Sequence, residues 1–440
     1  MKGKWIAVGL MVVGIVAGFS LFWAGHTQTN HKGTSSNPYN SSQGYKGQGY
    51  YTVNGQTTYI SNADQFNNSI TYNTTSNVSV ETNTMQTTTN IISAQNVTKY
   101  IYCIGGENLT PLATFNNYAN ELTNKTYYAT VNGSGIGKWK STTPYPVPAN
   151  MVGNRVSQYP TCVTANNYVY CMDSQFSVTT SGENISYGYE NNAIFFAQLS
   201  SSGIGTWKRT KNYPAAAFLS SEAPTCVVYA DVIYCLGGEG DQGFVNDTYY
   251  AKLNTTGGIN KWEYSANSSP MIGEGFDCLT YQSKIYCIGT DPIENNTYYA
   301  NLSGQGITQW HTSESTFPIQ ELFASCIAYD SRIYCIGGSS FQSSQLGNSL
   351  DNISYATISS NGLSAWNAAP PYPYYVGGGL SCNISGNYVY CVGGGADVLS
   401  ADDSPINLTY FAPISETGIG TWRQTTSYPM SISNAACVIS

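Results

Sequence analysis

Apolar and polar residues alternate along a short stretch that recurs through the chain with little change. In each copy a central pair of residues interrupts the alternation, as in Asn166-Asn167 and Ala230-Asp231. Such an interruption between alternating runs is typical of a β-hairpin with a two-residue turn. The copies are TCVTANNYVYC (161–171), TCVVYADVIYC (225–235), DCLTYQSKIYC (277–287), SCIAYDSRIYC (325–335) and SCNISGNYVYC (381–391). The pattern therefore predicts five hairpins, each with a cysteine at both ends.

The register of such a hairpin decides whether its two cysteines can form a disulfide. Facing pairs alternate outward from the turn, which places Cys162 opposite Cys171 in a non-hydrogen-bonded pair with Cα atoms about 4.5 Å apart. A disulfide tolerates that separation. Free thiols or metal ligands are the alternative, but the spacing matches no zinc motif and the chain has only three histidines. The predicted bridges are Cys162–Cys171, Cys226–Cys235, Cys278–Cys287, Cys326–Cys335 and Cys382–Cys391.

Two cysteines lie outside these hairpins, one near each end of the repeated region. Cys103, in KYIYCIGG, carries the second half of the hairpin pattern, and Cys437, in AACVIS, carries the first half. We therefore expect the two ends to meet and form a sixth copy, closed by a Cys103–Cys437 disulfide. In the chain-entropy description, each hairpin bridge stabilises by roughly 2.7 kcal/mol and the long-range bridge by roughly 5.8 kcal/mol.

Two further strands follow each hairpin. The second hairpin strand ends in a glycine pair in most copies, as in CIGG (103–106), and an Asn-led strand with tyrosine comes next, as in NKTYYATV (124–131). A Gly-containing turn then leads to a last strand that carries one tryptophan. These tryptophans are Trp139, Trp207, Trp262, Trp310, Trp366 and Trp422. The pattern predicts a repeating unit of four strands, A to D in chain order.

This pattern resembles the kelch repeat, which combines an apolar strand, a glycine pair, an Asn-led strand with tyrosine and a tryptophan after a Gly-containing turn. The resemblance covers about 97–440 and implies an all-β, six-bladed β-propeller closed by the C-terminal strand. Radial stacking also buries both faces of units that cannot do so alone. We assign the propeller to 93–440. CMDS (171–174) and CIGT (287–290) depart from the glycine pair, and we expect a different backbone there.

The region before the repeats has a different composition. Two lysines near the start precede an uncharged run from Trp5 to Gly25, about long enough to cross a bilayer. We interpret 1–25 as an N-terminal transmembrane helix, with a cleaved signal peptide as the alternative. The Asn/Thr/Ser/Tyr-rich segment 26–92 is predicted to be a polar spacer or a β-arm for self-assembly, with a hairpin around Asn54-Gly55. Both interpretations place the remainder outside the cell, where paired cysteines persist.

An aromatic residue and a proline follow most of the tryptophans. The pairs are Tyr145-Pro146, Tyr213-Pro214, Phe317-Pro318, Tyr372-Pro373 and Tyr428-Pro429, with Ser269-Pro270 as the variant. We interpret them as packing corners between blades, because proline fixes the turn after strand D. An aromatic platform for a ligand is the alternative.

The connections from B to C and from D to A emerge on one face, because the A–B and C–D turns share the other. Their lengths are uneven: 107–123, 173–191, 239–245, 339–351 and 395–406 between B and C, and 147–160 and 215–224 between D and A. Uneven loops on a rigid repeated scaffold are where recognition is usually placed. We expect a binding face there.

The composition of the chain narrows the range of possible functions further. Charged residues make up 10% of the chain, its net charge is −8, and 37 residues are tyrosine. Nucleic acid is excluded as a partner because no basic stripe is present to neutralise phosphates. The sequence has no nucleophile elbow, phosphate-binding loop or metal-ligand cluster, so we expect no cofactor and no enzymatic activity.

Three enzymatic alternatives follow from the kelch resemblance. Galactose oxidase needs a copper site with two histidines, whereas only His311 lies in the repeats. Sialidase-like chemistry is disfavoured, because three clustered arginines are not easily assembled from the four in the chain, Arg155, Arg209, Arg332 and Arg423. A kelch-type sugar mutarotase would need Glu with Arg, for which the candidates are Arg155 with Glu222, or Glu239 with Asp241.

Asn-x-Ser/Thr sequons are dense and predict a glycoprotein. They begin at Asn40, Asn67, Asn73, Asn77, Asn96, Asn108, Asn124, Asn132, Asn184, Asn246, Asn254, Asn267, Asn295, Asn301, Asn352, Asn383 and Asn407. At the start of strand C the asparagine also belongs to the kelch pattern, where it can bond to the local backbone. Low charge and a sugar coat favour an archaeal surface protein.

Two functional classes remain open on the sequence. The preferred one is a membrane-tethered extracellular recognition or adhesion module that binds a glycan or a surface protein. The alternative is a structural subunit of a surface layer or filament, assembled through 26–92.

Overall fold

The computed structural model describes 98–440 with gaps at 112–117, 147–159, 173–176, 181–182, 187–191, 215–223, 241–242, 274, 290–294, 319–320, 343–344 and 396–405. It also describes three strands near the N-terminus, β1 (Leu21–Ala24), β2 (Gln48–Val53) and β3 (Gln56–Ile60). The chain divides into two compact units, Met1–Asn96 and Val97–Ser440.

The first unit contains one antiparallel sheet with the order β1-β2-β3. Val53 faces Gln56 across β2 and β3, the register expected of a hairpin around Asn54-Gly55. The rest of the predicted anchor and spacer lies outside the described residues. Among the described residues, no helix combines the length and the apolarity that a membrane span requires.

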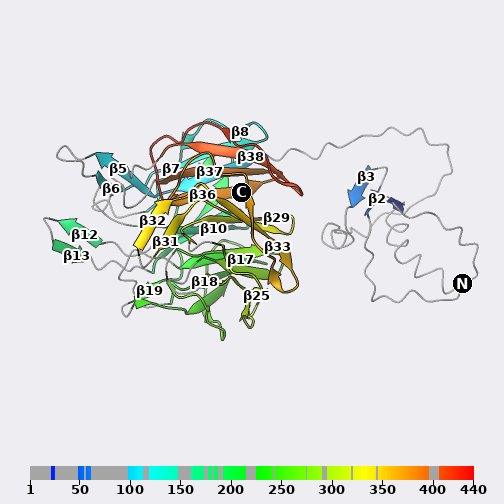
Figure 1. The fold of residues 1–440 in the computed structure, drawn as a ribbon, viewed down its shortest axis with the longest axis horizontal. Helices are drawn as coiled ribbons and strands as arrows, with labels where there is room; N and C mark the ends of the chain where they lie inside the picture. The colour runs from blue at the N-terminus through cyan, green and yellow to red at the C-terminus, as the bar shows by residue number, and fades with distance from the viewer. Residues whose placement is uncertain are drawn as a thin grey trace, which may run out of the picture. The chain divides into compact units, whose positions relative to one another are not determined.

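The second unit is a six-bladed β-propeller (Figure 1), as the repeat pattern predicts. The A strands are β41 (Ala436–Ile439), β10 (Thr161–Ala165), β17 (Thr225–Tyr229), β23 (Asp277–Tyr281), β29 (Ser325–Tyr329) and β36 (Gly378–Ser385). The B strands are β4 (Lys99–Ile104), β11 (Tyr168–Met172), β18 (Val232–Leu236), β24 (Lys284–Ile288), β30 (Arg332–Ile336) and β37 (Tyr388–Gly395). The C strands are β7 (Thr126–Asn132), β14 (Ile194–Ser200), β21 (Thr248–Lys252), β25 (Tyr298–Ser303), β33 (Ile353–Ser359) and β38 (Thr409–Ser415). We number the blades one to six in this order.

The ring closes through the two ends of the repeated region. Each A strand lies beside the A strands of the neighbouring blades, and β41 touches both β36 and β10. Because β41 pairs with β4, the C-terminal strand completes the first blade, with Cys437 opposite Cys103. The predicted closure is confirmed.

All six predicted disulfides are present in the structure. The hairpin bridges join cysteines whose Cα atoms are 4.1–4.2 Å apart, and Cys103 and Cys437 are 4.0 Å apart. The turns also follow the prediction: Asn166 and Asn167 both have positive φ, 50° and 62°, as a type I′ turn requires. Correct turn chemistry therefore sets the register that brings the cysteines together.

Strand D is less regular than the sequence suggests. In five blades it consists of two short pieces that pair with strand C on either side of the tryptophan. The pieces are β8 (Gly135–Ile136) and β9 (Lys140–Ser141), β15 (Gly203–Ile204) and β16 (Lys208–Arg209), β26 (Gly306–Ile307) and β27 (His311–Thr312), β34 (Gly362–Leu363) and β35 (Asn367–Ala369), and β39 (Gly418–Ile419) and β40 (Arg423–Gln424). In the third blade an isolated bridge, Leu253 to Ile259, replaces the first piece, and β22 (Glu263–Tyr264) is the second.

Candidate binding face

The B–C connections contain strands that the sequence did not predict. Short hairpins form from β5 (Glu107–Pro111) and β6 (Tyr118–Leu122), β12 (Ser177–Thr180) and β13 (Glu183–Ser186), β19 (Glu239–Gly240) and β20 (Gly243–Phe244), and β31 (Ser339–Gln342) and β32 (Gln345–Ser349). In Figure 1, β5, β6, β12, β13 and β19 extend on the same side of the blades. We call the side that carries the B–C and D–A connections the connection face.

The D–A connections fold back over the glycine pair of their own blade. In the fifth blade, Val376 accepts a hydrogen bond from the amide of Gly338 at 2.8 Å and donates one to Leu350 at 3.1 Å. Gly337 has a φ of 68°, and a Cβ atom on it would overlap Cγ2 of Val376. Glycine is therefore required for two reasons: the backbone is left-handed at this position, and the D–A connection leaves no room for a side chain.

The backbone differs at the copy that lacks a glycine pair and that the structure describes, as expected from the sequence. Gly289 in the fourth blade has a φ of 133°, whereas Gly337 has 68°. A Cβ atom on Gly289 would lie 2.8 Å from Cα of Phe276, so the connection that arrives from the third blade passes close there. Residues 173–174 of the second blade lie outside the described residues.

A few large apolar side chains remain exposed, and most of them are on the connection face. Five such side chains are exposed among the described residues: Phe244, Tyr264, Ile272, Tyr374 and Tyr375. Four of the five belong to B–C or D–A connections, while Tyr264 lies on the outer strand β22. Tyr375 is 61% exposed. Exposed apolar residues that gather on one surface often mark an interaction site.

Tyr374 and Tyr375 lie in a connection of restricted flexibility. They follow Tyr372-Pro373, and Val376, next in the chain, is anchored to the blade by its backbone hydrogen bonds. Proline fixes one backbone dihedral, which lowers the entropy that the segment would lose on binding. Sequence reasoning missed these two residues, although the extra tyrosines after Tyr372-Pro373 were a visible signal.

The Tyr-Pro and Phe-Pro pairs are packing corners, as preferred from the sequence. The ring of Tyr428 lies edge-on to Trp139 of the next blade at 4.9 Å, and Tyr372 lies in the same way against Trp422 at 5.1 Å. The same contact joins Tyr145 to Trp207, Tyr213 to Trp262, and Phe317 to Trp366. The five aromatic residues before proline are at most 2% exposed, so they cannot serve as a ligand platform.

The variant Ser269-Pro270 keeps the corner by a different packing. The amide of Ser269 donates to the carbonyl oxygen of Asn246 at 2.9 Å, and Tyr145 donates to Asn124 in the same way at 2.9 Å. Met271, 1% exposed, belongs to the apolar cluster against which Trp310 packs. The backbone bond is thus retained although the aromatic ring is absent.

The candidate enzymatic residues do not form a cluster where the structure describes them. His311 lies on the outer piece β27 and stacks on Tyr299 at 5.3 Å. Arg209, Arg332 and Arg423 lie on the second, fifth and sixth blades. Arg155, Glu222, Asp241 and the side chain of Glu239 are outside the described residues. Within the described part of the chain, no three His, Cys, Asp or Glu residues could hold a metal ion together.

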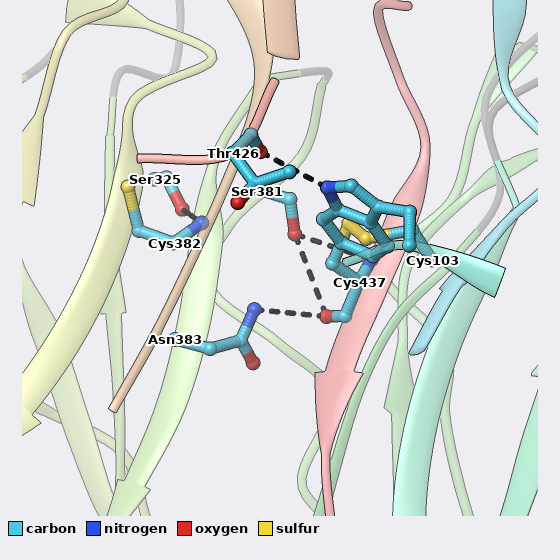
Figure 2. The surroundings of a disulfide bond; sticks show 8 residues. Cys103, Ser325, Ser381, Cys382, Asn383, Thr426 and Cys437 are labelled. Atoms are coloured by element: carbon cyan, nitrogen blue, oxygen red, sulfur yellow. Dashed lines mark hydrogen bonds between the residues drawn. A yellow bond between two sulfur atoms is a disulfide. The ribbon is translucent and has the colours of Figure 1, made fainter. Parts of the chain in front are cut away.

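The A strands are joined by a side chain that precedes each of several cysteines (Figure 2). Ser381 accepts a hydrogen bond from the amide of Cys437 at 3.2 Å, and Ser325 accepts one from Cys382 at 3.0 Å. Asp277 holds the equivalent position between the fourth and fifth blades and accepts from the amide of Cys326 at 2.8 Å. We call this contact the A-strand clasp.

Asp277 is the one clasp residue among these three that can ionise. Burial raises the pKa of its carboxyl to about 6, more than the hydrogen bonds from the amides of Cys326 and Cys278 lower it. The carboxyl is enclosed by protein although part of the residue remains accessible. Burial also raises the pKa of Tyr234 on strand β18 to about 12, so its hydroxyl stays protonated.

Fold and disulfides together define the class of protein: a six-bladed β-propeller whose ring is closed by a long-range disulfide. Six disulfides and no free cysteine point to an oxidising, extracellular environment.

Comparison with known proteins does not define this protein more finely than the class of six-bladed β-propellers. No protein family matches the chain, and no curated protein is similar to it. Solved structures do match, and one of them, titled "Structure of YjhT", is 16% identical with a TM-score of 0.47. The match covers 66% of this chain and 87% of the other. At that level of similarity, it does not assign a function to the chain.

Proposed function

We propose that this protein is an extracellular recognition or adhesion module that binds a glycan or a surface protein through the connection face. The observation that carries the proposal is the placement of exposed apolar residues. Most described aromatic side chains of the blades are buried or half-buried, many of them in packing corners and inter-strand stacks, yet Tyr374 and Tyr375 are exposed on a connection with limited backbone freedom. Loops on a rigid scaffold commonly carry recognition.

The chemistry of this connection favours an uncharged partner. No charged residue occurs between Pro370 and Leu380, and the two tyrosines offer flat apolar rings with a hydroxyl at the tip. Tyrosine is enriched at interfaces because it supplies contact area and a hydrogen bond while few rotatable bonds become fixed. Sugar rings and protein surfaces of low charge both suit such a surface.

Finer aspects of the proposal rest on the sequence. We assign the blades to the kelch type because glycine pairs, Asn-led C strands and tryptophans recur at equivalent positions. An archaeal origin, tethering to the membrane through 1–25 and a non-enzymatic role complete the proposal. A sugar mutarotase assay tests the non-enzymatic role. Turnover by the parent protein that is lost on substitution of Glu239 would contradict that role.

Binding by the connection face can be tested with a double substitution. Tyr374→Ala with Tyr375→Ala removes both rings, and we expect binding to intact source cells and to an array of neutral glycans to weaken by about tenfold or more. Tyr264→Ala is the matched control, because Tyr264 is also exposed, at 53%, but lies on an outer strand. Unchanged binding by the double variant, or equal loss in the control, would reject the assignment.

A structural role in a surface layer or filament is the second candidate. The observation that favours it is the pairing of β2 with β3, because both strands belong to the polar segment 26–92. Deletion of 26–92 separates the candidates. If assembly is lost while glycan or cell binding persists, the structural role is supported.

A further inference from the structure

The propeller sequons whose side chains the structure describes fall into three structural groups. Strand-C starts hold five of them, at Asn124, Asn246, Asn295, Asn352 and Asn407. Three others, Asn254, Asn267 and Asn383, use their side-chain amides in the fold. Asn132 and Asn301 form the third group, near the C–D turns. The groups differ in whether the asparagine and the hydroxyl two residues later can be reached.

In the first group the hydroxyl residue is buried. Thr126, Thr248, Thr297, Ser354 and Thr409 are at most 6% exposed. The hydroxyl of Thr409 donates to the carbonyl oxygen of Thr426 at 2.8 Å, and that of Thr297 donates to Ser315 at 3.1 Å. Once strand C has paired, the recognition element of the sequon is therefore closed to an enzyme.

The second blade shows why asparagine recurs at this position. Asn192 stands there, and its side-chain Nδ2 donates to the carbonyl oxygen of Tyr213 at 2.8 Å, in addition to the backbone bond from the amide of Tyr213. Two residues after Asn192 comes Ile194, so this copy has no sequon. The asparagine thus supports the packing corner with or without a sequon, and the sequon at the other starts is a by-product of the repeat.

In the second group the atom that would carry a sugar is already bonded. Nδ2 of Asn383 donates to the carbonyl oxygen of Cys437 at 3.0 Å (Figure 2), and Nδ2 of Asn267 donates to Ile307 at 2.9 Å. Asn254 accepts hydrogen bonds from Thr256 and Gly258 and donates to Asn260. Glycosylation at these sites would replace one of the two hydrogens on an Nδ2 atom that already holds two strands or a turn together.

Only the third group, among sequons whose side chains the structure describes in the blades, presents both elements to solvent. Asn132 and Asn301 are exposed, as are Ser134 and Ser303 two residues after them. Neither side-chain amide donates a hydrogen bond within the described residues. We propose that Asn132 and Asn301 are the N-glycosylation sites of the propeller's C–D turns and that the strand-C and bonded sequons stay unmodified.

The modification requires an activated sugar donor of the lipid-linked sugar phosphate class. Nδ2 forms a bond to the anomeric carbon, the bond from that carbon to the phosphate oxygen breaks, the lipid phosphate leaves with the electron pair, and Nδ2 loses one proton. An enzyme can reach Asn132 and Asn301 together with their exposed serines from the solvent, whereas the buried hydroxyls of the strand-C starts are out of its reach.

The positions of the two proposed sites predict which face of the propeller the glycans would cover. They lie on the first and fourth blades, which are opposite each other in the six-membered ring, and on the side of the C–D turns. Glycans there would cover the face opposite the connection face and leave the exposed tyrosines open. The inference does not depend on the proposed binding function, since it rests on exposure and hydrogen bonding alone.

Site-specific mass spectrometry of peptides from the full chain, isolated from its native source, tests the proposal. We expect glycan mass on the peptides of Asn132 and Asn301 and none on those of Asn124, Asn295 and Asn383. The Ser134→Ala variant should lose the glycan of Asn132 alone. Unmodified Asn132 and Asn301, or comparable occupancy at Asn124 or Asn295, would overturn it.

A created sequon provides a matched control. Ile194→Thr gives Asn192 the hydroxyl that the other strand-C starts have, in a position where threonine is accommodated in four other blades. If burial closes these sequons, Asn192 remains unmodified in the variant while Asn132 keeps its glycan. A new glycan at Asn192 would show that burial is not the criterion and would reject the proposal.

Discussion

At the scale of single residues, the glycine pair shows how a repeat constrains one position in two ways. Gly337 needs both a left-handed backbone and room for Val376, whereas Gly386 needs only the first and Gly304 needs neither. Gly386 has a φ of 55°, yet no atom lies within 4 Å of the position that a Cβ atom would take, and Gly304 has neither constraint. These three positions separate the backbone contribution from the steric one.

We expect the free energy of unfolding to follow that order on substitution by alanine. Gly337→Ala should destabilise by about 2–4 kcal/mol because strain and overlap add. Gly386→Ala should cost about 1 kcal/mol from the backbone alone, and Gly304→Ala should stay within about 0.5 kcal/mol of the parent. Urea unfolding of the three variants measures the series. An equal cost at Gly337 and Gly386 would show that Val376 moves aside freely.

Asp277 gives the stability of the propeller a defined dependence on pH. Its carboxyl titrates at about 6 in the folded protein against 3.8 when unperturbed, so the folded state holds a proton that the unfolded state releases between these values. Binding more protons in the folded state makes stability fall as pH rises. Asp277 therefore costs stability above about pH 6 and costs nothing below about pH 4.

The Asp277→Ser variant tests this sign. Serine fills the same place in the A-strand clasp at Ser325 and Ser381 and does not ionise. At pH 7 we expect the variant to be more stable than the parent by about 1–2 kcal/mol, a value reduced for the partial exposure of the residue. The difference should vanish near pH 4. Unfolding free energies at several pH values give the comparison, and a difference independent of pH would contradict the assignment.

At the scale of elements, the corner after strand D joins one blade to the next. An aromatic ring from one blade meets the edge of the tryptophan of its neighbour, and a backbone hydrogen bond to the start of strand C holds the corner in place. The hydroxyl of Tyr372 is buried without a hydrogen-bond partner among the described residues, whereas that of Tyr213 donates to Cys235 at 3.3 Å.

The two corners should respond differently to loss of the hydroxyl. Tyr372→Phe removes an unsatisfied polar atom, and Phe317 shows that phenylalanine fits such a corner, so we expect no loss and up to about 1 kcal/mol of gain. Tyr213→Phe should lose about 0.5–1.5 kcal/mol with its hydrogen bond. Thermal unfolding of both variants provides the test. A comparable loss at both positions would indicate that Tyr372 bonds to a water molecule.

At the scale of the whole molecule, one contact between distant parts of the chain completes the ring. Cys103 and Cys437 are separated by 334 positions in sequence, while the other bridges span 9. A bridge across a longer loop removes more entropy from the unfolded chain. The closing disulfide is therefore expected to contribute more than any hairpin bridge.

Paired alanine variants compare the two kinds of bridge. Removing Cys103 with Cys437 should lower the free energy of unfolding by about 3 kcal/mol more than removing Cys382 with Cys391. The second pair is the matched control, because each variant loses one bridge and the two bridges lie in adjacent blades. Denaturant unfolding under non-reducing conditions measures the difference. Equal losses would mean that the unfolded chain retains contacts between its ends.

The sequence by itself determined the repeat, the hairpin register, all six disulfides and the closure of the ring. These depend on local patterns: alternation of period two, a two-residue turn, and cysteines at fixed distances from it. Even the closing strand was visible, because Cys103 and Cys437 each carried half of a pattern that the other copies carry whole.

Only the tertiary structure decided which side chains are exposed and which are enclosed. Whether Tyr375 is accessible, whether Asp277 is buried, and whether Thr126 can be reached all depend on connections and neighbouring blades that approach from elsewhere in the chain. The hairpins of the B–C connections were also missed, since their short strands lack a strong apolar alternation. Local sequence specifies a blade, but burial is a property of blades packed together.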